Sequence, residues 1–179
     1  MKQIPTASQT VGPFFGIGLG YLCNPSASAQ GDTVNIHGCV LDANRRPVSD
    51  AILELWQADP DGHYPVNPNA SGRAGGFLRL ATDDTGCFRF TTCRPGAVPF
   101  DETRMQAPHI VVLVFARGLL RHLITRMYFP GESANSSDPV LQSIAESRRG
   151  TLVARRESAD TLEWNVVLQG ADETVFFAW

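Results

Sequence analysis

The feature that most constrains the fold is a series of short segments with β-strand character, separated by sequences typical of turns. Several of them alternate apolar with polar residues, as in Leu162, Trp164, Val166 and Leu168. The sequences DANRRP, DPDG, DDTG and QGAD lie between segments and favour turns. The segments are residues 34–41, 51–57, 76–82, 87–92, 109–116, 121–129, 162–168 and 174–179. This spacing predicts an all-β domain, an antiparallel β-sandwich.

A single segment carries strong helix signals. Asp138 is a suitable N-cap, Pro139 suits the first helical position, and Val140, Leu141 and Ile144 follow at helical spacing. We therefore expect one short helix late in the chain, beside a sandwich whose long loops carry the function.

The composition disfavours several classes of function. The 179-residue chain has 15 Lys and Arg against 18 Asp and Glu, and its basic pairs are scattered, so no nucleic-acid partner is expected. The four cysteines, Cys23, Cys39, Cys87 and Cys93, form no C-x-x-C pair. We expect reduced thiols in a cytoplasmic protein, although an even number of cysteines leaves disulfides open.

The N-terminus superficially resembles a secretion signal, because an apolar run is followed by small residues. Gly12, Pro13 and further glycines interrupt that run, however, and disfavour a helical signal segment. No segment approaches the length of a transmembrane span, so no membrane partner is expected. We predict an N-terminal arm and linker over residues 1–33 and a β-sandwich core over residues 34–179.

Two residues in or beside the long connections 58–75 and 93–108 have metal-binding chemistry. Tyr64 offers a phenolate oxygen and His109 an imidazole nitrogen, a pair that suits Fe(III). A metal site on a strand would place a second ligand two residues after His109, but that position holds Val111. From the residues alone, a structural tyrosine and a core histidine remain the alternatives.

Longer motifs carry a resemblance to a known family. They are SQTVGPFF, LELWQADPDGHY, DDTGCFRFTTCRPGAVPF, APHIVVLVFARG and QGADETVFF, which extend in order from about Ser8 to the C-terminus. Together they resemble the intradiol ring-cleaving dioxygenases, and most narrowly the α-type subunits of that family. The resemblance implies a β-sandwich core, in agreement with the strand pattern.

The resemblance also implies the loss of a metal site. Iron-carrying members take four ligands from a G-x-Y loop, a G-P-Y-P-W loop and an H-x-H strand. In this chain those positions are Tyr64, Val98, His109 and Val111, so half of the ligand set is aliphatic. We therefore expect no metal on this chain, and Fe(III) carried instead by a homologous partner, the β subunit.

A division of labour between the two chains follows from the resemblance. The arm of the α chain helps to wall the pocket of the iron-bearing β chain, where 3,4-dihydroxybenzoate and O₂ react to 3-carboxy-cis,cis-muconate. The arm residues expected to contact substrate are Thr10, Gly12, Pro13 and Phe14. Arg117 is the candidate for binding the substrate carboxylate, or else it anchors the strand end, whereas Arg121 and Arg126 are expected on the surface.

Three alternatives remain at this stage. In the first alternative, the arm covers an edge strand of the sandwich and does not contact substrate. The chain would be a stand-alone, transthyretin-like β-sandwich that binds a small molecule in the former metal pocket. Least favoured is a homomeric dioxygenase with an unusual ligand set, because two valines cannot coordinate iron.

Overall fold

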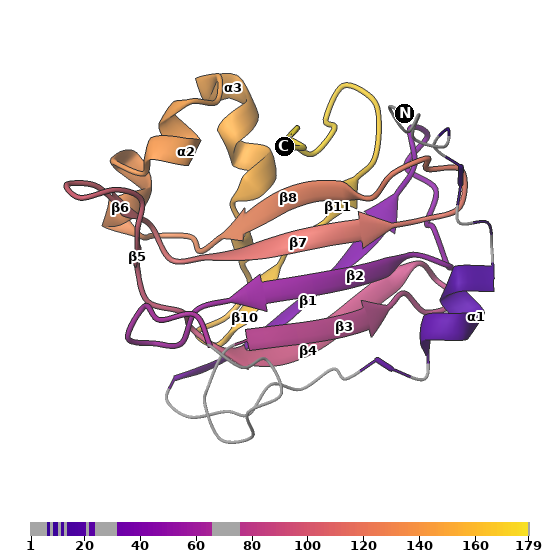
Figure 1. Ribbon diagram of the computed structural model, residues 1–179, viewed down its shortest axis with the longest axis horizontal. Coiled ribbons are helices and arrows are strands. Elements are labelled where there is room, and N and C mark those ends of the chain that lie inside the picture. Colours follow the sequence, from indigo (N-terminus) through magenta and orange to yellow (C-terminus); the bar gives the residue numbers. More distant parts are fainter. Residues whose placement is uncertain are drawn as a thin grey trace, which may run out of the picture.

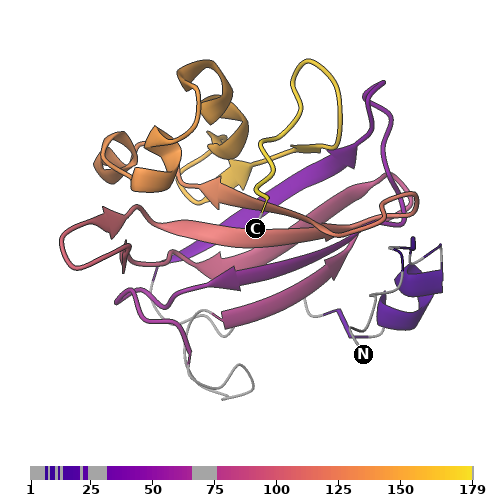
Figure 2. The ribbon, with the colours of Figure 1, turned by 45° about the horizontal axis from the view of Figure 1, so that its top comes forward.

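The computed structural model describes residues 7, 9–10, 12, 14–20, 22–23, 32–65 and 76–178. Two β-sheets pack face to face, as Figures 1 and 2 show. The first sheet contains β1 (Thr33–Leu41), β4 (Cys87–Cys93), β9 (Arg155–Arg156), β10 (Thr161–Glu163) and β11 (Val166–Val167). The second contains β2 (Ile52–Gln57), β3 (Gly76–Ala81), β7 (His109–Phe115) and β8 (Leu123–Tyr128), in the order β3-β2-β7-β8. A separate hairpin joins β5 (Val98–Pro99) to β6 (Met105–Gln106). The predicted all-β sandwich is confirmed.

The main core lies between the two sheets. In strands such as β1, β3 and β7, alternate residues face inward and are buried, because successive side chains of a strand point to opposite faces. The buried side chains include Ile36 and Val40 of β1, Leu53 and Leu55 of β2, Phe88 and Phe90 of β4, and Ile110, Val112 and Val114 of β7. Full burial of each such side chain contributes about 1.5–3 kcal/mol to folding.

The last third of the chain differs from the prediction. Segment 162–168 is two short strands, β10 and β11, and both run parallel to β1 rather than antiparallel. The interruption falls at Asn165, whose side-chain oxygen accepts the Cys39 N–H at 2.8 Å in place of a main-chain carbonyl. The expected strand 174–179 is wrong for its described residues, 174–178, which contribute only an isolated bridge between Ile124 and Phe177.

The helices are short, and they are more numerous than predicted. Asp138 caps α2 (Pro139–Gln142) as expected, but one turn follows before α3 (Glu146–Arg149) begins. Single 3₁₀ turns flank the pair at Ser133–Ser136 and Gly150–Leu152. Helix α1 (Phe14–Gly20), in the arm, was not predicted, because its glycines disfavour a helix in isolation. None of the helices in the described ranges is long and apolar enough to cross a membrane.

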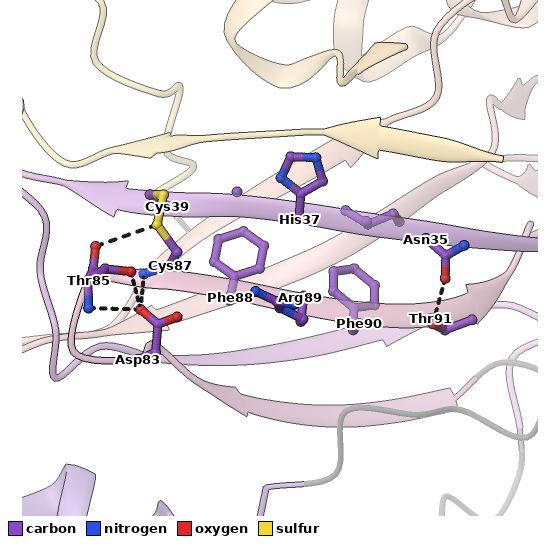
Figure 3. Close-up of a pocket in the computed structure, with 12 residues that line it drawn as sticks. Asn35, His37, Cys39, Asp83, Thr85, Cys87, Phe88, Arg89, Phe90 and Thr91 are labelled. Carbon is purple, nitrogen blue, oxygen red and sulfur yellow. Dashed lines mark hydrogen bonds between the residues drawn. A yellow bond between two sulfur atoms is a disulfide. The ribbon is translucent and has the colours of Figure 1, made fainter. Parts of the chain in front are cut away.

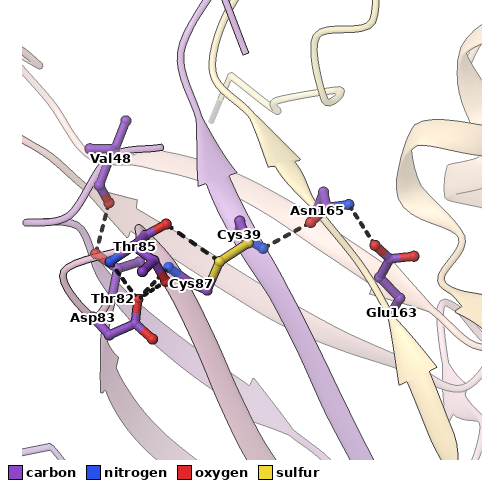
Figure 4. Close-up of a disulfide and its surroundings, with 8 residues drawn as sticks. All are labelled: Cys39, Val48, Thr82, Asp83, Thr85, Cys87, Glu163 and Asn165. Atoms are coloured by element: carbon purple, nitrogen blue, oxygen red, sulfur yellow. Dashed lines mark hydrogen bonds between the residues drawn. A yellow bond between two sulfur atoms is a disulfide. The ribbon is translucent and has the colours of Figure 1, made fainter. Parts of the chain in front are cut away.

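The cysteine prediction is wrong for one pair. Cys39 and Cys87 form a disulfide between β1 and β4 (Figure 4). The two residues are direct cross-strand partners in the β1–β4 ladder, with their Cα atoms 3.9 Å apart. Their separation of 48 residues in the sequence gave no sign of this register. The proposed boundary between residues 33 and 34 stays a prediction, since residues 24–31 lie outside the described part.

Candidate functional site

The predicted site residues Tyr64, His109 and Arg117 lie at two opposite ends of the second sheet. Strands β2 and β7 are antiparallel, so the end of β2 lies beside the start of β7. The loop that contains Tyr64 follows β2, and His109 begins β7, which brings both to one end. Arg117 follows β7 and lies at the other end, where β2 begins and α1 packs (Figure 1). We refer to these as the tyrosine–histidine end and the arm end.

His109 is a buried, fully paired imidazole. Its side chain is 2% exposed, and Nδ1 lies 2.8 Å from the Ala107 carbonyl oxygen, to which it donates. Nε2 therefore carries the lone pair and accepts from the Tyr64 hydroxyl at 3.4 Å. Burial, assisted by the positive charge of Arg126, lowers the pKa of His109 from 6.5 to about 4. The imidazole is neutral at neutral pH.

Tyr64 is held over this histidine by an aromatic neighbour. Its ring stacks on Trp56 with a centroid distance of 6.0 Å and an interplanar angle of 4°. Burial raises the pKa of the Tyr64 phenol, and the charge of Arg126 offsets only part of that rise. Tyr64 is therefore a neutral hydrogen-bond donor in this arrangement rather than a phenolate.

The other two positions of the implied ligand set cannot coordinate a metal. Val98 is 3% exposed within the β5–β6 hairpin, and Val111 is paired across the sheet with Trp56 and Arg126. The described residues contain no group of three or more His, Cys, Asp or Glu side chains placed to hold a metal ion. One imidazole and one neutral phenol do not fit Fe(III), which requires a fuller set with anionic oxygen.

Arg126 is the residue of this end that the sequence analysis misplaced. It was expected on the surface, yet it is 9% exposed. Its Nη1 donates to Gln106 Oε1 at 2.7 Å and to the Tyr128 hydroxyl at 3.3 Å. Strand alternation does place Arg126 and Tyr128 on the outer face of the sheet, where solvent is usual. The reason for the burial is tertiary. Side chains of the helical segment after β8, including Leu141, pack against Tyr128 on that face. The Phe177 ring and Gln106 lie against Arg126 itself.

Asp138 joins the helical segment to this network. Its side chain is completely buried, and Oδ2 accepts the Ala107 N–H at 2.7 Å. Oδ1 accepts the Tyr128 hydroxyl at 3.2 Å and the two main-chain N–H groups at the start of α2. Burial raises the pKa of Tyr128 well above its ordinary value. A chain of hydrogen bonds thus runs from the Arg126 guanidinium through Tyr128 to a buried carboxylate.

At the arm end, Arg117 is exposed and carries an ion pair. Its side chain is 64% exposed, and Nε lies 2.9 Å from Asp50 Oδ2. No hydrogen bond of good geometry from the described residues reaches the Asp50 carboxylate, so the pairing is electrostatic. Helix α1 approaches the same place, since a Cβ atom added to Gly16 would lie 3.6 Å from the Asp50 carbonyl oxygen.

The arm residues named from the sequence lead into α1. Gly12 has φ +67°, a left-handed conformation that suits glycine, and its N–H donates to Thr10 Oγ1 at 3.3 Å. Phe14 begins α1 and is 76% exposed. Pro13 lies outside the described residues. The structure thus brings the arm and Arg117 to one end, apart from Tyr64, Val98, His109 and Val111.

A cleft of about 740 Å³ lies elsewhere, along β1 and β4 (Figure 3). None of the predicted site residues lines it. Several of its polar side chains bond to near neighbours: Asp83 Oδ1 accepts from the Thr85 and Cys87 N–H groups, and Thr91 donates to Asn35. This arrangement leaves no set of groups converging on a reaction centre.

Comparison with known proteins agrees with the fold. Residues 20–170 match a family model described as dioxygenase. The chain is 41% identical to the protocatechuate 3,4-dioxygenase alpha chain of Burkholderia cepacia, over 99% of this chain and 98% of that protein. The chain belongs to the intradiol dioxygenase family.

Two further members of the intradiol dioxygenase family are less similar to this chain than that alpha chain. The protocatechuate 3,4-dioxygenase beta chain of Burkholderia cepacia is 34% identical over 80% of this chain and 67% of that one. The solved dioxygenase domain from Streptomyces sp. SirexAA-E superposes with a TM-score of 0.61 at 24% identity, covering 96% of both chains. That structural likeness supports the fold alone.

Proposed function

We propose that this chain is the α subunit of a protocatechuate 3,4-dioxygenase and works with a homologous β subunit that carries Fe(III). The observation that carries the proposal is the pair of valines, Val98 and Val111, at ligand positions in a chain that matches an alpha chain over its whole length. The similarity to a beta chain supports a homologous partner. A stand-alone binding module is disfavoured by the same full-length match.

The partner's iron supplies the oxidative chemistry, and this chain contributes binding and orientation. The substrate, 3,4-dihydroxybenzoate, has a flat ring and a carboxylate, and its reaction with O₂ yields 3-carboxy-cis,cis-muconate. The exposed ring of Phe14 offers an apolar surface to the substrate ring, and Thr10 offers a hydroxyl. The exposed Arg117 guanidinium is suited to a carboxylate. The left-handed conformation of Gly12 directs these groups, and Pro13 is proposed as a further contact from the sequence.

The arm end also has the character of an interface with the partner. Phe14 and Ile17 are each 76% exposed, and Leu120 in the turn after β7 is 61% exposed. We propose that the β subunit covers this surface and that each pair buries more than about 2,000 Å². The aromatic side chains of Phe176 and Phe177 near the C-terminus are not part of this surface, because they pack against the two cores of this chain.

The proposal includes a cytoplasmic location. In that reducing compartment the Cys39–Cys87 disulfide is expected to open, whereas it would persist in an oxidising one. Alkylation of the thiols in freshly lysed cells, followed by mass spectrometry, distinguishes the two states.

The decisive experiment separates the substrate-binding role of Arg117 from assembly. In the α–β complex, Arg117→Gln is expected to lower kcat/KM for 3,4-dihydroxybenzoate by about tenfold or more, since a charge-assisted hydrogen bond is lost. For catechol, which has no carboxylate, kcat/KM should change little. The matched control is Arg45→Gln, which removes another exposed arginine paired with an aspartate, Asp172. Equal losses on both substrates would contradict carboxylate binding.

Deletion of residues 1–15 tests the arm. We expect a lower turnover or a higher KM, while the complex still forms and the partner keeps its iron. If assembly and activity are lost together, the arm covers a sheet edge instead. A chain that stays monomeric at micromolar concentration with the β chain present would refute the proposed partnership.

A further inference from the structure

Arg126 lies against the tyrosine–histidine pair. It is the direct cross-strand partner of Val111, and His109 pairs in the same way with Tyr128, so all four side chains share one face of the sheet. The positive charge of Arg126 acts on both groups: burial raises the pKa of Tyr64 and Arg126 opposes that rise, whereas burial lowers the pKa of His109 and Arg126 adds to that fall. The pocket that lacks two ligands therefore holds a cation of its own.

The hydrogen bonds of this region are organised around that cation. Arg126 donates to Gln106 and to the Tyr128 hydroxyl, and that hydroxyl donates in turn to the buried carboxylate of Asp138. The two direct partners of the guanidinium are neutral, and neither of them is Tyr64. Tyr64 is left as a neutral phenol, and its hydroxyl engages Nε2 of His109, the ring nitrogen whose lone pair faces the pocket.

We propose that Arg126 is the resident cation of the former metal pocket and excludes a metal ion from it, in addition to the loss of two ligands. A guanidinium cannot be deprotonated at any ordinary pH, so its charge cannot be relieved when a second cation approaches. Little solvent screens the repulsion, because Arg126 is buried. The inference concerns this chain alone and stands whether or not the chain pairs with a β subunit.

The proposal predicts that restoring the ligands is insufficient. The double variant Val98→Tyr/Val111→His is expected to stay essentially free of iron while Arg126 is present. Adding Arg126→Gln to the double variant should strengthen Fe(III) binding by at least about tenfold. The matched control adds Arg121→Gln instead, which removes an exposed arginine beyond the end of β7 and should leave the chain free of iron.

The test uses the full chain purified after growth with iron. Iron is counted by elemental analysis, Fe(III) affinity is measured by competition with a chelator, and visible absorption reports tyrosinate bound to Fe(III). If a partner co-purifies, the iron content of the wild-type preparation serves as the reference value for the variants. Circular dichroism and the melting temperature establish that each variant is folded, and Arg126→Met serves as a second neutral replacement.

The outcomes decide the proposal in either direction. The proposal is supported if the double variant takes up iron when Arg126→Gln or Arg126→Met is added. It must also stay free of iron when Arg126 is kept or is replaced by Lys. Tight iron binding by the double variant with Arg126 in place would overturn it, even if neither neutral variant folds. Equal binding by the Lys and Gln versions would overturn it as well, since charge would then be irrelevant.

Discussion

Replacement of Asp138 by alanine should destabilise the protein more than any exposed aspartate replacement. The carboxylate is completely buried and accepts four hydrogen bonds. Two come from the Val140 and Leu141 N–H groups at the start of α2, one comes from the Ala107 N–H, and one comes from the Tyr128 hydroxyl. No water can replace the carboxylate without entering the covered face of the sheet, so Asp138→Ala leaves buried donors unpaired.

The expected loss follows from these contacts. Removal of a helix N-cap costs about 1 kcal/mol. Each buried donor left without a partner costs about 1–3 kcal/mol, which applies to the Ala107 N–H and the Tyr128 hydroxyl. The total is about 4 kcal/mol of unfolding free energy. For a chain of this length, that loss corresponds to a melting temperature lower by roughly 8–16 °C.

Chemical denaturation and thermal melting at neutral pH provide the measurement. Asp83→Ala is the matched control, because Asp83 also accepts several hydrogen bonds, from Thr85 and Cys87, but in an exposed turn. We expect the unfolding free energy of the control to fall by less than about 1 kcal/mol, since water can bond to the exposed donors that the missing carboxylate leaves. Asp138→Asn, which keeps a good cap, should fall between the two. Equal losses for both alanine variants would refute the reasoning from burial.

Three further predictions concern pH, the disulfide and a glycine. His109 has a folded pKa of about 4, below its ordinary 6.5, so the unfolded state binds the proton first. The unfolding free energy should therefore fall by about 3 kcal/mol as pH drops from 6.5 to 4, and His109→Asn should flatten this dependence in denaturation curves. Replacing Cys39 and Cys87 by serine should cost about 4 kcal/mol if the bridge is formed in the purified protein, and an unchanged melting temperature would contradict this. Gly38→Ala places a Cβ 1.7 Å from the Trp164 carbonyl oxygen, and should cost about 3 kcal/mol by denaturation through displacement of β10 from β1.

The sequence by itself determined most strands of the sandwich, the cap at Asp138 and the inability of Val98 and Val111 to bind a metal. Strands have a side-chain period of two, so the alternation of Phe88 and Phe90 with polar neighbours is visible without coordinates. An N-cap bonds to main-chain N–H groups two or three residues later, so it too can be recognised in the sequence. Val98 and Val111 have no donor atom in their side chains, so these two positions cannot coordinate a metal through a side chain in any fold.

Only the tertiary structure decided what covers each face and which distant residues meet. Alternation places Arg126 on the outer face of β8, but its burial there depends on Phe177 and Gln106, which long-range packing brings against it. The Cys39–Cys87 bridge depends on the register of two strands far apart in the sequence. Likewise, the arm meets Arg117 through Asp50 because β2 and β7 run antiparallel. Local periodicity specifies the face on which a side chain lies, whereas long-range packing decides whether that face meets water, another element or a buried charge.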